Sequence, residues 1–204
     1  RGIDGFAQLL IDDYGDRLDE AALSSLRRIQ DGAKQLGRFT EDILNLSRLT
    51  RLKLEVEPLD LTAMATWVVD ALRRAEPDRQ VEVRIDEGMT GVGDRRIVHA
   101  VLEVTIGNAW RFTGPVEDAR IHVGSDEGPG DTTIFFVADN GIGFDMRYAD
   151  KLFAPFQSVH PPGVSEGTGM GLALAQRILL RTGGTIWADS GVGEGSRFYF
   201  TLTG

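Results

Sequence analysis

The chain has 204 residues, of which 42% are hydrophobic and 26% are charged, enough for one sizeable core or two modest ones. It contains no cysteine, which excludes disulfide bonds, thiolate metal clusters and cysteine nucleophiles. The formal net charge of -9 argues against a nucleic-acid partner, because the phosphate backbone would be repelled. No apolar run approaches the roughly 20 residues that cross a bilayer, and a signal-peptide layout is missing, so we expect a soluble, cytoplasmic chain.

Apolar residues recur at steps of three and four between residues 21 and 49, which predicts one long amphipathic helix. The positions are Ala22, Leu26, Ile29, Ala33, Leu36, Ile43 and Leu44. Residues 5–11 have the same character, and the turn-forming residues 12–16 separate the two segments. We therefore expect a helix, a short loop and a longer helix over residues 1–50.

This helical hairpin has too little core to be stable alone. Its second helix also carries apolar residues on more than one face, including Leu23, Phe39 and Leu46. We expect two hairpins to form a homodimeric four-helix bundle. The alternative is that the helices cover the other domain, and the length of the second helix argues against it.

A boundary follows the hairpin, where Pro58 ends a short alternating stretch, and we place a linker at residues 51–59. Helix and strand signals interleave in residues 60–204. The expected helices cover residues 61–74, 98–112 and 172–180, and the expected strands cover residues 81–85, 121–123, 132–138 and 198–202. This order predicts an α+β protein in which the hairpin precedes an α/β sandwich, a mixed sheet with helices on one face.

The first candidate site segment is residues 139–144, which directly follow an apolar strand. Its sequence, Asp-Asn-Gly-Ile-Gly-Phe, is also an ordinary hairpin turn signal. In a functional site, the carboxylate of Asp139 would accept a hydrogen bond from an exocyclic amine. The glycines would let a flat base approach the backbone closely. Both interpretations stay open from these residues alone.

The second candidate segment is glycine-rich and covers residues 166–172, at the start of an expected helix. Such a helix start offers backbone N–H groups to phosphate. With an acid about 20 residues later, the segment also imitates half of a dinucleotide-binding unit. That fingerprint must follow a strand, whereas here a proline-rich loop precedes it, which argues against a dinucleotide site.

The third candidate segment, residues 107–113, covers the last turns of an expected helix. Asn108 could be a helix-terminating amide without another role. With Arg111 one turn later, an oxygen ligand and a cation lie on one face, as a metal-phosphate group requires.

The order of these segments resembles the catalytic domain of sensor histidine kinases. The residues at 108–112, 139–144, 152–156 and 167–172 are similar to that family's N, G1, F and G2 boxes. Residues 5–10 and 42–48 are similar to its dimerising hairpin, so the resemblance extends over nearly the whole chain. Gyrase and chaperone ATPases share such a pocket, but a helical hairpin directly upstream is not typical of them.

The resemblance implies ATP and Mg²⁺ as cofactors. By it, Asp139 would bind the adenine amine and Asn108 would coordinate Mg²⁺. Arg111 would contact phosphate, and Phe112 would pack near the base. The other nucleotide-binding residues that it implies are Gly141, Gly143, Lys151, Gly167, Thr168, Gly169, Gly171 and Leu172. Residues 145–166 would form a mobile lid.

The phosphate-accepting histidine of the family lies on the first hairpin helix, in a segment whose last residue matches Arg1. The resemblance therefore implies that the acceptor histidine lies just upstream of Arg1 and that this chain carries no acceptor. His99, His122 and His160 fall on a helix, on a strand and in the lid. We expect structural or solvent-facing roles for them.

Two positions depart from the family pattern. Val104 stands where the family usually has a second asparagine, and Ser158 stands where its lid usually has an arginine. Loss of a polar group and of a cation near the transferring phosphate would weaken catalysis. Glu103 and Arg147 are the nearby residues that could substitute for them.

These observations favour a histidine kinase core that uses Mg-ATP to phosphorylate its own dimer and then passes the phosphoryl group to a response regulator. The partners implied are a second copy through residues 1–50, a receiver domain and an upstream sensor domain. The alternative is a kinase-impaired nucleotide-binding dimer scaffold or a phosphatase-biased signalling protein, which Val104 and Ser158 favour.

Overall fold

The structure is a computed structural model and describes residues 2–51, 53–157, 159 and 168–202. Gly167, Ser158, His160 and part of the expected lid lie outside the described residues. The chain divides into two compact units, Arg1–Ser47 and Arg48–Gly204, and each is described by itself. In the described part of the chain, no helix combines the length and the apolar character that a membrane span needs.

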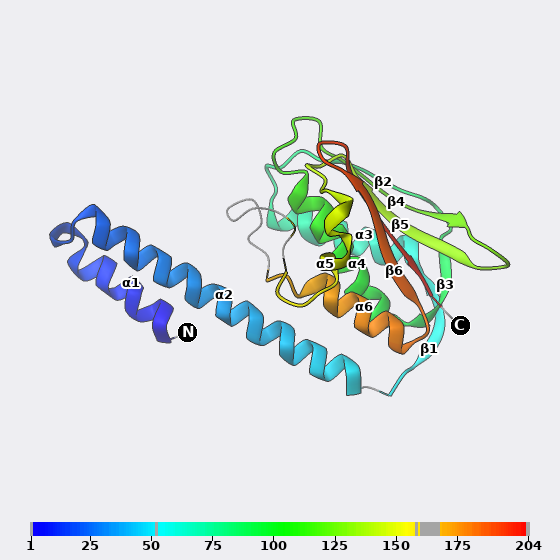
Figure 1. The fold of residues 1–204 in the computed structure, drawn as a ribbon, viewed down its shortest axis with the longest axis horizontal. Helices are drawn as coiled ribbons and strands as arrows, with labels where there is room; N and C mark the ends of the chain where they lie inside the picture. The colour runs from blue at the N-terminus through cyan, green and yellow to red at the C-terminus, as the bar shows by residue number, and fades with distance from the viewer. Residues whose placement is uncertain (1, 52, 158, 160–167, 203–204) are drawn as a thin grey trace. The chain divides into compact units, whose positions relative to one another are not determined.

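The first unit is a helical hairpin (Figure 1). Helix α1 spans Gly2–Tyr14, the 3-10 turn η1 spans Gly15–Arg17, and helix α2 spans Glu20–Arg51. Asp19 caps α2, because its Oδ1 accepts the N–H of Ala22 at 2.8 Å. The helices touch where Gln30 Nε2 donates to Gln8 Oε1 at 2.8 Å. Both expected helices are present, but the turn begins at Gly15 because the three preceding polar residues continue α1.

The second unit is built on a five-stranded sheet with the order β2-β4-β5-β7-β6. Its strands are β2 (Glu82–Ile85), β4 (Arg120–Glu127), β5 (Thr133–Asp139), β6 (Thr185–Gly191) and β7 (Gly195–Thr201). Strands β2 and β4 are parallel, and the other neighbours are antiparallel. The expected α+β fold with a mixed sheet is therefore confirmed for this unit.

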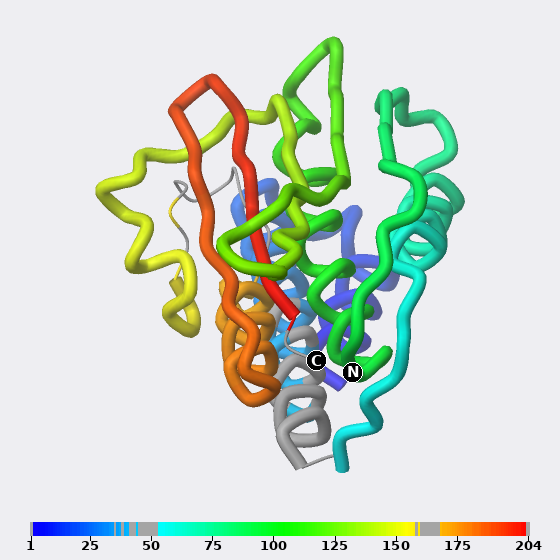
Figure 2. Tube along the Cα trace, turned by 90° about the vertical axis from the view of Figure 1, so that its right-hand side faces the viewer, coloured from blue at the N-terminus to red at the C-terminus, as the bar shows by residue number. Residues whose placement is uncertain are grey.

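Three helices cover one face of this sheet (Figures 1 and 2). They are α3 (Leu61–Ala75), α4 (Arg95–Phe112) and α6 (Gly171–Arg181). Side chains alternate along each strand, so the buried Phe135 and Val137 of β5 face the helices together with Phe200 of β7. Asp60 and Asp94 cap the starts of α3 and α4. The core thus lies between the helices and the sheet and fixes the end of α4 over β5.

A short helical segment follows β5. It consists of the 3-10 turn η2 (Met146–Tyr148) and helix α5 (Ala149–Leu152). Leu152 is buried in a small apolar cluster with Phe144 and Phe198, which we call the Phe144 cluster. This cluster anchors the chain just after β5 to the sheet.

A separate two-stranded sheet pairs β1 (Val56–Asp60) with β3 (Thr90–Asp94) in antiparallel fashion. The sequence pattern predicts a linker over residues 51–59, whereas the structure pairs its last four residues with β3. Strand β3 has no counterpart among the expected strands, because Gly91 and Gly93 interrupt its apolar alternation. A Cβ at Gly91 would lie 3.1 Å from the side chains of Leu61 and Leu202, so close packing favours glycine there.

Candidate functional site

Asp139 ends strand β5 on the side of the sheet that faces the helices. Its Oδ1 accepts the N–H of Gly141 at 2.8 Å, and the backbone of Ser196 gives a second hydrogen bond. Burial raises the pKa of the Asp139 carboxyl to about 6, and the two hydrogen bonds offset only part of this rise. The strand end therefore presents an acceptor that is held in place and little hydrated.

The loop after Asp139 is held against the end of α4. The N–H of Ile142 donates to Phe112 O at 3.2 Å. A Cβ on Gly141 would lie 2.5 Å from the same oxygen. Gly143 has a φ of +57°, and its Cβ would lie 1.9 Å from a carbonyl oxygen of β6. Close backbone packing thus requires both glycines, a reason that does not involve a ligand.

Helix α4 carries Asn108, Arg111 and Phe112 near its end, and Phe112 contacts this loop. Asn108 and Arg111 are one turn apart, the first half-buried and the second exposed. The Arg111 guanidinium lies 5.5 Å from the centre of the Phe112 ring. Within the described ranges, no group of three His, Cys, Asp or Glu side chains could hold a metal ion. Asn108 carries an amide oxygen, a type of ligand that Mg²⁺ accepts.

The start of α6 is the third part of the site. Met170 precedes the helix and, in the part of the chain that the structure describes, gives it no side-chain cap. Helix starts of this kind, where the first N–H groups have no partner within the helix, form many phosphate sites. Gly169 has a φ of +68°, and its carbonyl oxygen accepts the N–H of Phe156 at 3.2 Å. The hydroxyl of Thr168 accepts the N–H of Met170 at 3.2 Å.

The structure brings these three segments together. A Cβ on Gly171 would lie 3.3 Å from the Val104 side chain, so α4 packs closely on the start of α6. Leu172 packs against the Phe144 cluster. Lys151 lies on α5, where its Nζ is 5.4 Å from the centre of a tyrosine ring. The expected residues that the structure describes thus come mainly from the ends of β5 and α4 and the start of α6.

Two residues outside the motifs support the loop after Asp139. Ser190 Oγ accepts the N–H of Phe144 at 2.9 Å and donates to Gly195 O at 2.7 Å. Gly195 has a φ of +86°, and a Cβ on it would lie 2.0 Å from Asp139 O. Both residues lie at strand ends beside an ordinary hairpin turn, so no local signal in the sequence marks them.

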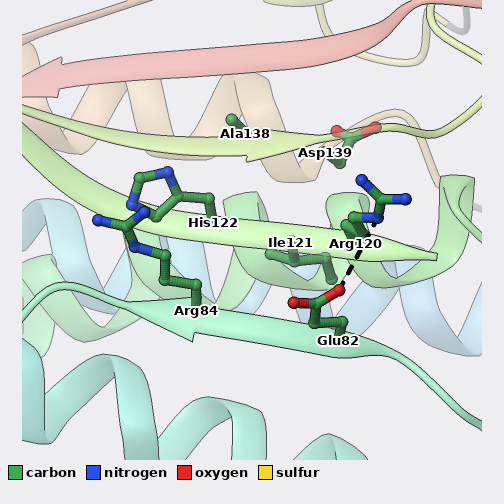
Figure 3. Close-up of a pocket in the computed structure, with 7 residues that line it drawn as sticks. All are labelled: Glu82, Arg84, Arg120, Ile121, His122, Ala138 and Asp139. Carbon is green, nitrogen blue, oxygen red and sulfur yellow. Dashed lines mark ion pairs between the residues drawn. The ribbon is translucent and has the colours of Figure 1, made fainter. Parts of the chain in front are cut away.

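A pocket of about 250 Å³ opens beside strands β2, β4 and β5 (Figure 3). Its lining consists of Glu82, Arg84, Arg120, Ile121, His122, Ala138 and Asp139. The strand register pairs Glu82 with Arg120, and His122 with both Arg84 and Ala138, so these five alternate on the face away from the helices. The pocket therefore opens mainly on the face away from the helices, and it shares Asp139 with the site between β5, α4 and α6.

Residues 93–203, more than half of the chain, match the family model described as histidine kinase-, DNA gyrase B-, and HSP90-like ATPase. The chain belongs to this ATPase family. The matched residues include strands β4, β5, β6 and β7 of the five-stranded sheet and the helices α4 and α6.

Relatives of known role narrow the class to histidine kinases. Cyanobacterial phytochrome B of Nostoc sp. is 32% identical over 204 residues, which cover 99% of this chain and 27% of that protein. The methanogenesis regulatory histidine kinase FilI of Methanothrix harundinacea is 33% identical, over 98% of this chain and 22% of that protein. This chain thus spans about a quarter of the length of such relatives, and its resemblance to a sensor histidine kinase catalytic domain is confirmed.

Solved structures agree on the fold. The histidine kinase AdeS of Acinetobacter baumannii superposes with a TM-score of 0.70 at 24% identity, over 99% of this chain and 93% of that one. Full-length ShkA in complex with AMPPNP gives a TM-score of 0.68 at 23% identity, over 100% of this chain and 43% of that one.

Proposed function

We propose that this chain is the catalytic core of a sensor histidine kinase. It binds Mg-ATP, phosphorylates a histidine upstream of Arg1 within a homodimer, and supplies the phosphoryl group to a response regulator in the cytoplasm. The observation that carries the proposal is Asp139, a carboxylate held at the end of β5 in a loop that is bound to the end of α4. The structural neighbour ShkA was solved in complex with AMPPNP, which supports nucleotide binding by this chain.

Each part of the site has a role in this proposal. Asp139 accepts a hydrogen bond from the adenine amine, and Asn108 contributes a magnesium ligand. Arg111 and the first N–H groups of α6 face the phosphates. During transfer, the bond from the γ-phosphorus to the bridging oxygen breaks while a bond to the histidine nitrogen forms. The protein contributes mainly position and charge neutralisation to such a step.

The test is transfer of label from γ-labelled ATP and Mg²⁺ to a chain extended upstream through the expected histidine. Acid-labile label on the extended chain, and none on residues 1–204 alone, is the expected result. Addition of a receiver domain should then remove label from the kinase. Absence of label despite intact nucleotide binding would contradict the kinase proposal.

Nucleotide affinity should depend on pH through Asp139. The folded pKa of about 6 lies above the ordinary 3.8, so the carboxylate that binds an amine is lost as pH falls through 6. Affinity should therefore fall by about tenfold per pH unit below 6 and level off above about 7. Calorimetric titrations with AMPPNP between pH 5 and 8 measure this. A flat profile would show that Asp139 does not contact the base.

A second candidate function is a nucleotide-binding scaffold or a phosphatase-biased protein with an impaired kinase step. Val104 favours it, because an apolar side chain packs on Gly171 where the family usually has an amide. The two nearby residues that could substitute have local partners: Arg147 Nε donates to Asp145 at 2.8 Å, and Glu103 lies 3.4 Å from His99. Ser158, the other departure, lies outside the described residues.

Val104→Asn should raise the rate of histidine labelling in the extended chain by roughly 5- to 30-fold, because one polar contact near the phosphates is worth about 1–2 kcal/mol. Val104→Ala is the matched control, since it removes the same packing and adds no polar group. Equal rates for Val104, Ala and Asn would show that this position does not limit the kinase step.

Dimerisation through residues 1–50 is part of the same proposal. The hairpin exposes large apolar side chains, which a second copy would cover: Ile3, Phe6, Leu9, Leu10, Ile29, Leu36 and Leu44. Such exposure on a helical hairpin favours a four-helix bundle. An upstream sensor domain would connect to the same hairpin.

Phe6→Asp should weaken the dimer. Phe6 is 71% exposed in the single chain, and a symmetric bundle would bury the Phe6 ring of both copies. Loss of about 1.5–3 kcal/mol for each ring predicts a dissociation constant raised by roughly 100-fold or more. Sedimentation velocity over a concentration series measures it. Asp13→Ala on the same helix is the control, and unchanged dimer with Phe6→Asp would place the interface elsewhere.

A further inference from the structure

Arg79 lies in the connection between α3 and β2, outside every motif of the site. Its backbone N–H donates to Glu76 O at 3.2 Å and closes a turn. Its side chain is only 19% exposed, unusually low for an arginine, and it points at the last turn of α4.

The guanidinium makes three contacts with that turn. Its Nη2 donates to Trp110 O and, at 3.1 Å, to Thr113 Oγ1. Its carbon lies 4.9 Å from the centre of the Trp110 ring. A planar cation can satisfy a carbonyl, a hydroxyl and an aromatic face together, which an ammonium group cannot do as well.

The contacted turn is the one that carries the nucleotide site. The last carbonyls of a helix have no N–H partner within it, and their partners decide how its end is held. Trp110 O is bound by Arg79, and Phe112 O is bound by Ile142 of the loop after Asp139. Asn108 lies two residues before Trp110. A positive charge at a helix C-terminus also stabilises the helix end.

We propose that Arg79 is a positioning residue for the nucleotide site, which sets the last turn of α4 so that Asn108 meets the magnesium ion of bound Mg-ATP. This inference rests on the proposed function. It assigns a role to a residue that touches neither nucleotide nor metal. Arg79 acts on the site through the backbone of α4. Its substitution should therefore lower nucleotide affinity in the presence of Mg²⁺ more than in its absence.

The test compares AMPPNP affinity with Mg²⁺ and with EDTA, using residues 1–204. Arg79→Gln should lower the affinity with Mg²⁺ by about tenfold, as loss of an outer support of a metal ligand does, and should change the EDTA value less than about threefold. Asn108→Ala should show the same pattern. Arg79→Lys should be intermediate, and Arg74→Gln, on the exposed last turn of α3, should match the native chain.

The outcomes separate this inference from the proposed function. Failure of the native chain to bind AMPPNP would overturn both. A native magnesium effect that persists in Arg79→Gln would overturn the positioning role alone. Equal losses with and without Mg²⁺ would show a general structural role, which also overturns it. Should Arg79→Gln fail to fold, the Arg79→Lys variant and its thermal midpoint provide the same comparison.

Discussion

Asp139→Asn is expected to lower ATP affinity by roughly 10- to 100-fold, because the variant replaces a charged acceptor whose hydrogen bond contributes about 1.5–3 kcal/mol. The asparagine keeps the shape of the side chain and an oxygen for the N–H of Gly141. The substitution should therefore weaken the hydrogen bond to the nucleotide and leave the hydrogen bond to Gly141 in place. Calorimetric titration with ATP and Mg²⁺ at pH 8, where the native carboxyl is ionised, measures it.

The stability of the same variant at pH 8 should not fall with its affinity. A folded pKa raised from 3.8 to about 6 means that the native fold loses stability as pH rises across that range. Asp139→Asn removes this penalty, so its free energy of unfolding at pH 8 should equal or exceed that of the native chain. Asp131→Asn, in the exposed turn between β4 and β5, is the control. Affinity unchanged by Asp139→Asn would rule out both the kinase and the scaffold proposals.

The sequence predicted most of the sheet and its helices because their patterns are local. Val83 and Ile85 alternate with charged residues in β2, and Phe198 and Phe200 alternate in β7, as expected for strands with one buried face. Strand β3 could not be predicted. Its Gly91 and Gly93 weaken any strand signal, and its pairing with β1 depends on residues 30 to 38 positions away.

The site shows the same division between local and distant information. Asp139 and its glycines stand in one short segment, so a motif could mark them. The contacts that require glycine at these positions come from residues distant in the sequence, because Gly141 packs on Phe112 and Gly143 packs on β6. Arg79 and Ser190 act on the site across the fold, and single-sequence patterns do not carry such contacts. Conversely, glycines attributed to a ligand by resemblance also have a packing reason that the sequence alone could not show.

Asp94 and Arg96 hold residues 53–55, in the expected linker, against the start of α4, and we call these contacts the buried clasp. Asp94 is only 2% exposed; its Oδ2 accepts the N–H of Glu55 at 2.9 Å and its Oδ1 caps α4. The Arg96 side chain holds both carboxylate oxygens and donates to Lys53 O at 3.0 Å. These contacts bind residues 53–55 to the start of α4, the helix that carries Asn108.

Asp94→Ala should lower the free energy of unfolding by on the order of 3 kcal/mol, because it removes a helix cap and leaves the N–H of Glu55 and a charged arginine without their acceptor. Urea unfolding at pH 7 measures the loss. The Arg96 guanidinium holds the pKa of Asp94 well below the ordinary 3.8, so its contribution is complete above that pH and shrinks as pH falls below it. The difference in the free energy of unfolding between native and variant chains should therefore narrow in acid.

Arg95→Gln is the control, because it breaks only the exposed pair with Glu57. It should lower the free energy of unfolding by less than about 1 kcal/mol. Equal losses for the two variants would show that the buried clasp does not hold the linker.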